Sequence, residues 1–176
     1  MVVLMKNEVS FEKRKAKTDE WYTPIERVKT IEKYIPKDIT VWCPFDTEQS
    51  YFVKELGGAR TIVHSHIQDG RDFFTYMPSE HFDCIVSNPP YSKRNAVYKR
   101  LFEIGKPFAM LMNFNGLFDC KLRYELFKKH GVQLLIPCGR TNFYSDYAHE
   151  LPATQPPFQA VYVCWRLLDK DIVFAD

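Results

Sequence analysis

The chain has 176 residues, of which 45% are hydrophobic and 26% charged, and this composition predicts one globular domain with a sizeable core. A net charge of +2 excludes a whole-molecule field strong enough to hold nucleic acid, so any such grip needs a local basic patch. No apolar stretch approaches the ~18 residues of a membrane span. The five cysteines are dispersed and form no C-x-x-C pair, which argues against a disulfide framework and against a zinc site.

The first 20 residues or so differ in character from the rest. Residues 1–19 are polar and basic, and we expect a basic arm that is either a solvated tail or a contact for phosphates. Thr23 is a natural N-cap and Pro24 suits a first helical position, so a helix is expected from Ile25 to about Ile35. Residues 20–176 are interpreted as one catalytic domain.

Short apolar runs alternate with helical patterns along the rest of the chain. The predicted strands are residues 39–43, 61–63, 81–87, 107–112, 132–136 and 160–168. The predicted helices are residues 48–56, a segment capped by Ser92 that runs to Gly105, and residues 121–130. This alternation indicates an α/β layer fold with a mostly parallel sheet.

One motif carries most of the chemistry. Asn88-Pro89-Pro90-Tyr91 directly follows a predicted strand, and ligands of open α/β sheets bind at the carboxyl ends of strands. Two prolines remove two backbone donors, so their carbonyls are expected to point outward without a competing local N–H. The Asn88 side chain adds an acceptor, and Tyr91 adds a flat stacking face.

These parts suit an aromatic amine as a methyl acceptor. Two oxygens that bind the two N–H groups of adenine N6 localise its lone pair and stabilise the positive charge that grows during methyl transfer. Stacking on Tyr91 would align the nitrogen with the methyl donor. The plainer alternative is a proline-rich turn that only leads the chain out of a strand.

The motif resembles the signature of amino methyltransferases that use S-adenosylmethionine and modify adenine N6, cytosine N4 or glutamine amides. Within them, the chain is most similar to small phage- and prophage-type DNA adenine-N6 methyltransferases. The resemblance implies a Rossmann-like methyltransferase fold, a mostly parallel sheet with an antiparallel edge strand, and no separate target-recognition domain. It also implies DNA as the partner, in the cytoplasm of a bacterial or phage-infected cell, with no role for a membrane. Sequence specificity is then weak, or a second copy in a homodimer or another partner supplies it.

The resemblance assigns the cofactor to residues before the motif. Tyr22, Thr23 and Pro24 are similar to a segment that lies against S-adenosylmethionine. Pro44 and Phe45 stand in the loop that approaches its methionine moiety. In this loop Cys43 occupies the usual acidic position, the usual glycines are missing, and Asp46 or Glu48 would meet the ammonium group instead.

Further cofactor contacts follow along the chain. His66 stands where an acid normally accepts from the ribose hydroxyls. Asp72 would accept from the amine of the cofactor's adenine, Phe73 would pack on that ring, and Asn88 would border the cofactor as well as the substrate. No metal is expected.

The target base has two candidate aromatic contacts, Tyr91 and Phe143. Residues 140–144 and the segment ending at Phe158 are similar to the family's late segment, in which an aromatic flanks the base. Phe143 is equally interpreted as a core side chain. Four basic residues follow the motif, and they form either a solvated helical face or a phosphate contact. These are Lys93, Arg94, Lys99 and Arg100.

The sequence therefore supports methylation of adenine N6 in DNA, with alternatives left open. RNA adenine or a protein glutamine could be the acceptor. A third hypothesis is a non-catalytic nucleic-acid-binding relic that has lost its cofactor, because the first loop and His66 depart from the family pattern.

Overall fold

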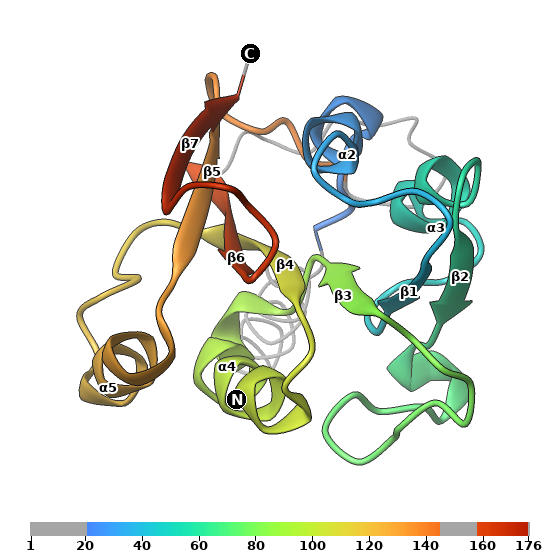
Figure 1. Ribbon diagram of the computed structural model, residues 1–176, viewed down its shortest axis with the longest axis horizontal. Helices are drawn as coiled ribbons and strands as arrows, with labels where there is room; N and C mark the ends of the chain where they lie inside the picture. Colours follow the sequence, from blue (N-terminus) through green and yellow to red (C-terminus); the bar gives the residue numbers. More distant parts are fainter. Residues whose placement is uncertain (1–20, 145–157, 176) are drawn as a thin grey trace, which may run out of the picture.

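The computed structural model describes residues 21–144 and 158–175, which form one seven-stranded sheet with helices on both faces (Figure 1). The predicted basic arm, residues 1–19, lies outside the described residues. None of the described helices is long and apolar enough to cross a membrane. All five cysteines are free thiols.

The strand order across the sheet is β2-β1-β3-β4-β6-β5-β7. The strands are β1 (Thr40–Cys43), β2 (Thr61–His64), β3 (Cys84–Ser87), β4 (Phe108–Asn113), β5 (Gln133–Pro137), β6 (Ala160–Trp165) and β7 (Ile172–Ala175). Every predicted strand is present, which confirms the α/β fold class, and β7 is an additional strand that was not predicted.

The sheet is parallel except for β6, which runs antiparallel to both β4 and β5. An antiparallel strand was expected at an edge, and that detail is wrong. β6 lies inside the sheet because β5 pairs with its far side and β7 then pairs parallel to β5. The edge strands are β2 and β7.

The described residues contain four α-helices and two short 3-10 helices, of which α2 precedes the first strand. They are α2 (Ile25–Glu32), η1 (Ile67–Asp69), α3 (Tyr51–Leu56), η2 (Tyr91–Lys93), α4 (Arg94–Ile104) and α5 (Lys121–His130). Ser50 caps α3 by accepting from the Phe52 N–H. The predicted caps Thr23 and Ser92 are wrong by one residue each, since Pro24 and Lys93 hold those positions.

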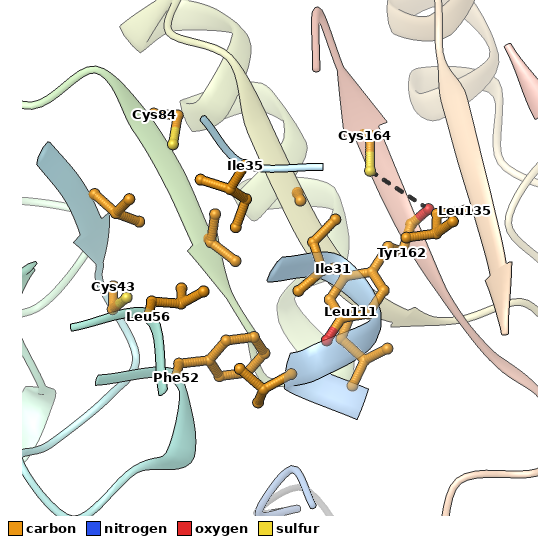
Figure 2. Close-up of a cluster of buried hydrophobic side chains, with 14 of the residues drawn as sticks. Ile31, Ile35, Cys43, Phe52, Leu56, Cys84, Leu111, Leu135, Tyr162 and Cys164 are labelled. Atoms are coloured by element: carbon orange, nitrogen blue, oxygen red, sulfur yellow. Dashed lines mark hydrogen bonds between the residues drawn. The ribbon is translucent and has the colours of Figure 1, made fainter. Parts of the chain in front are cut away.

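The core has two halves because successive side chains of each strand point to opposite faces. One half lies under α2 and α3, where Ile31, Phe52 and Leu56 meet alternate residues of the strands (Figure 2). The other half lies under α4 and α5, which pack against Trp42, Ile85 and their neighbours. Both faces of the central strands are therefore covered, and ligands can approach only from the strand ends.

The segment before α2 is fixed near the middle of the sheet by contacts over long sequence separations. Tyr22 and Tyr144 form a backbone bridge, with N···O distances of 3.1 and 2.9 Å. Arg27 donates to the Thr141 hydroxyl at 2.9 Å and to the Cys138 carbonyl at 2.9 Å. These bonds hold residues 21–24 close to the carboxyl end of β3.

Candidate active site

A buried carboxylate joins the loops that follow β1 and β3. Asp46 accepts hydrogen bonds from the hydroxyls of Ser50, which caps α3, and Ser87, the last residue of β3. Burial raises the pKa of the Asp46 carboxyl to about 6, and the two hydrogen bonds oppose that rise. Both carboxylate oxygens of Asp46 accept hydrogen bonds within the protein, so Asp46 fixes the geometry of the loop after β1. The sequence had predicted a contact between Asp46 and the ammonium group of the cofactor.

Asn88 follows Ser87 directly, and its side chain has a defined orientation. The amide nitrogen Nδ2 donates to the Trp21 carbonyl at 2.6 Å. A carbonyl can only accept, so the NH₂ group must face Trp21 and the oxygen Oδ1 must face the other way. Oδ1 is buried and has no hydrogen-bond partner in the described part of the chain. Such an acceptor is costly unless a ligand occupies it.

The two prolines of the motif have different environments. Pro89 is buried, and Pro90 is extended with φ −63° and ψ 123°. The Pro90 carbonyl accepts from the Lys93 N–H at 3.1 Å, because the chain turns into η2 there. The expectation that both proline carbonyls lack a local donor is therefore wrong for Pro90. The Pro89 carbonyl, beside Asn88, is the remaining candidate for a second acceptor.

A group of aromatic rings includes Tyr91 of the motif and Trp21, whose carbonyl binds Asn88. Tyr91 and Phe158 meet edge to face with ring centroids 5.5 Å apart, and the Trp21 ring lies 6.4 Å from that of Phe158. Phe143 is completely buried, 5.8 Å from Trp21, and so has no surface with which to stack on a base. Phe158, not Phe143, is the ring that faces Tyr91.

The predicted cofactor segment Tyr22–Pro24 lies beside the same strand end. Its backbone is held by the Tyr22–Tyr144 bridge, and Asn88 binds the preceding Trp21 carbonyl. The Thr23 hydroxyl Oγ1 is buried and has no partner among the described residues, so it is free to meet a ligand. Pro24 is buried and its carbonyl starts α2 by accepting from the Val28 N–H at 3.3 Å.

A surface hollow of about 400 Å³ lies at the carboxyl ends of β1 and β2. It is lined by Thr47, Glu48, Gln49, His64, Gln68, Asp69 and Arg71. His66, which was predicted to bind the cofactor here, is not part of this lining, and its Nδ1 accepts from the Gln68 N–H at 3.2 Å. His64 was missed, although its Nδ1 is buried without a partner among the described residues.

Asp72 and Phe73 lie in the segment after this hollow. Asp72 Oδ1 accepts from the Phe74 N–H at 3.1 Å. Phe73 is almost completely buried, with ring centroids 4.8 Å from Phe45 and 5.5 Å from Trp42. Phe73 therefore serves as a core side chain in this structure, and the half-buried rings of Phe45 and Phe74 around it are more accessible. Pro44 is buried.

The basic residues after the motif make contacts within the protein. Arg94 donates to the Asn115 carbonyl at 2.9 Å, and Arg100 donates to the Tyr76 carbonyl at 3.5 Å. Lys99 pairs with Glu103, and the ammonium group of Lys93 lies 5.5 Å from the Phe74 ring centroid. Among the four, the exposed Lys93 stands next to Tyr91 and Ser92.

The sequence matches no protein-family model and no curated protein. Two solved structures are similar to it as a fold. A modification subunit of a putative type I restriction enzyme from Vibrio vulnificus YJ016 has a TM-score of 0.53 and 13% identity, over 91% of this chain and 47% of that one. A type I restriction-modification methyltransferase subunit from Streptococcus thermophilus has a TM-score of 0.50 and 12% identity, over 88% and 47%.

The chain spans about half the length of these two neighbours. At such low identity the likeness shows the fold and no more. Together with the strand order, it assigns to the chain the Rossmann-like fold of S-adenosylmethionine-dependent methyltransferases.

Proposed function

We propose that the protein transfers a methyl group from S-adenosylmethionine to the N6 amine of adenine in DNA. The observation that carries the proposal is the Asn88 side chain, whose oxygen is buried, oriented and without a partner in the described structure. An N–H donor is what such an oxygen requires. Its place at the end of β3 is where ligands of this fold class bind.

Asn88 and Pro89 hold the target nitrogen in this proposal. Asn88 Oδ1 and the Pro89 carbonyl each accept one N–H of the amine, which draws its lone pair out of the ring. The same oxygens stabilise the charge that develops as the nitrogen gains a fourth bond. The proton leaves after transfer, since the methylated amine is acidic, so no strong base is required at the site.

The residues present fit the cofactor, which supplies an electrophilic methyl group on a sulfonium. Thr23 Oγ1 and His64 Nδ1 are buried polar atoms without described partners. The hollow beside His64 suits the polar ribose end, with Glu48 and Asp69 as acceptors for hydroxyls. Asp46 holds the loop after β1 against Ser87 at the end of β3. It therefore fixes the cofactor side of the site relative to the acceptor side.

The aromatic rings favour a nucleobase over a glutamine side chain. Tyr91 and Phe158 offer flat surfaces next to the acceptor, and a planar base gains from stacking whereas an amide chain does not. An adenine within a duplex must leave the stack to reach such a site, which costs a few kcal/mol. The relic hypothesis is disfavoured because binding alone would not require an oriented, empty acceptor.

The test compares wild-type protein with two variants of one residue. Each is expressed in cells, and DNA, RNA and protein are digested and analysed by mass spectrometry for N6-methyladenine, N4-methylcytosine and N5-methylglutamine. Wild type is expected to raise N6-methyladenine in DNA. Asn88→Ala removes the acceptor and should lower the rate by about 10²- to 10³-fold, the usual effect of losing one such group.

Asn88→Asp is the matched control. It keeps an accepting oxygen but loses the donor to the Trp21 carbonyl, so it should retain more activity than Asn88→Ala. Equal loss in both variants would show that activity needs the Nδ2 bond to the Trp21 carbonyl as well as the accepting oxygen. A wild-type signal in RNA or in glutamine would move the proposal to that substrate, and full activity of Asn88→Ala would contradict it.

A further inference from the structure

The loop after β4 presents two large aromatic side chains to solvent. Phe114 is 41% exposed and Phe118 is 47% exposed. Exposed aromatic rings grouped on one loop mark an interaction surface more often than single exposed apolar residues do. Neither residue has a role in the acceptor site described above.

This loop has a defined shape. The Arg123 guanidinium, which is 2% exposed, donates to the Leu117 carbonyl at 2.9 Å and to the Gly116 carbonyl at 2.6 Å. Gly116 has a φ of 65°, and a Cβ there would lie 2.5 Å from Asp119 Oδ2, so the position favours glycine. The backbone that carries the two rings is therefore fixed by a buried arginine and by a turn that favours glycine.

The loop borders the candidate active site. Arg94, one helical turn beyond Tyr91, donates to the Asn115 carbonyl at 2.9 Å. On its other side, the Phe114 N–H donates to the Gln159 carbonyl at 2.9 Å, and the neighbouring Phe158 ring lies 5.5 Å from Tyr91. A strand of nucleic acid whose base lies against Tyr91 at the candidate site therefore passes this loop.

Two exposed lysines flank this region of the chain, and the one acidic residue of the loop is paired. Asp119, which would repel phosphates, is bound by Arg123 at 2.6 Å. Lys93 and Lys121 are exposed, one on η2 and one at the start of α5. Aromatic rings next to cationic side chains form the usual surface for single strands, because rings stack on bases and cations meet phosphates.

We propose that Phe114, Phe118, Lys93 and Lys121, here called the flanking platform, bind the nucleotides next to the target adenine on the same strand. This inference rests on the proposed function and specifies how its substrate is held. It predicts a preference for single-stranded or locally opened DNA, since paired bases have no free face to stack on the rings.

Binding of fluorescently labelled single-stranded oligodeoxynucleotides with one central adenine tests the platform, with anisotropy as the readout. Phe114→Ala and Phe118→Ala should each raise Kd about five- to tenfold, the effect of losing one stacked base. Phe114→Trp should restore the affinity. Phe174→Ala is the control, because Phe174 is also an exposed phenylalanine, 76% accessible, but lies on the edge strand β7.

Salt dependence separates the lysines from the rings. Lys121→Gln should reduce the slope of log K against log salt by about 0.7, the value for one phosphate contact on a single strand. Phe114→Ala should leave that slope unchanged. Lys170→Gln, an exposed lysine just before β7, serves as the charge control and should behave as wild type.

The outcomes distinguish this inference from the proposed function. If wild type methylates DNA adenine while both phenylalanine variants bind as wild type does, the platform is wrong and the proposed function stands. If the variants change the sedimentation of the protein alone, the loop is a contact between protein molecules, and the platform is again wrong. If wild type neither methylates nor binds DNA, both fail.

Discussion

At the scale of single residues, the motif was predictable but its working geometry was not. Asn88-Pro89-Pro90-Tyr91 is contiguous, so the sequence alone locates it after β3. The orientation of Asn88 depends on the Trp21 carbonyl, 67 residues away. The burial of Phe143 depends on Trp21 and Phe158, which no local pattern brings together. Contacts over such separations are set by the topology of the sheet.

Asp46 gives a prediction about pH at the same scale. Its pKa is about 6 in the folded protein against 3.8 in the unfolded chain, so the folded state binds more protons between these values. The contribution of Asp46 to the free energy of unfolding is therefore greatest below pH 4. It falls as the pH rises through 6 and is constant at higher pH. From about pH 4.5 to about pH 7.5 the loss is about 2 kcal/mol.

Asp46→Asn isolates this contribution, because asparagine does not titrate. Urea unfolding of both proteins at the two pH values gives the difference directly, and other carboxylates such as Asp83 cancel. The free energy of unfolding of wild type relative to the variant should be lower by about 2 kcal/mol at the higher pH than at the lower pH. A gap that does not depend on pH would mean that Asp46 has an ordinary pKa in the folded protein.

At the scale of elements, the helices and strands that were predicted best are those with a clear hydrophobic pattern. The apolar runs of β3 and β4 are buried on both faces and were found, as was α5 with its bounds. β7 was not predicted, although the four residues Ile172–Ala175 are apolar and as many as in β1, β2 or β3. The start of α2 was displaced because the Pro24 carbonyl accepts the first turn's bonds, and that of α4 because η2 precedes it.

The end of α2 provides a prediction for an element. Arg60 is buried and donates to three backbone carbonyls in this turn, those of Glu32 at 3.1 Å, Ile35 at 2.6 Å and Pro36 at 2.9 Å. A helix leaves its last carbonyls without internal partners, so this side chain acts as a cap that reaches over from the start of β2.

Arg60→Met keeps most of the apolar stem but leaves these carbonyls without donors. The free energy of unfolding should fall by about 2 to 3 kcal/mol, as measured by urea denaturation. Arg140→Met removes an exposed arginine and should change it by less than about 0.5 kcal/mol. Equal effects would show that water replaces Arg60 at no cost.

At the scale of the whole molecule, the strand order brings the site together. β1 has β2 on one side and β3 on the other, so the connections that leave β1 (to β2) and β3 (to β4) run to opposite sides of the sheet. The loop after β1, with Asp46, and the loop after β3, with Asn88, meet at this switch point and are joined through Ser87. The order of the strands does not follow from hydrophobic periodicity, and for this reason only the resemblance of the motif indicated it in advance.

A ligand that binds across this switch point must stabilise the entire fold, because the site exists only when β1, β2 and β3 are paired. S-adenosylhomocysteine at 100 times its Kd should add about 2.7 kcal/mol to the free energy of unfolding. For a chain of this length that raises the midpoint of thermal unfolding by about 5 to 10 °C, measured by scanning calorimetry. Adenosine alone contacts only part of the site, so its shift should be smaller at equal concentration. No shift with millimolar S-adenosylhomocysteine would favour the non-catalytic relic, since the hollow and the unpartnered Thr23 and His64 atoms would then hold no cofactor.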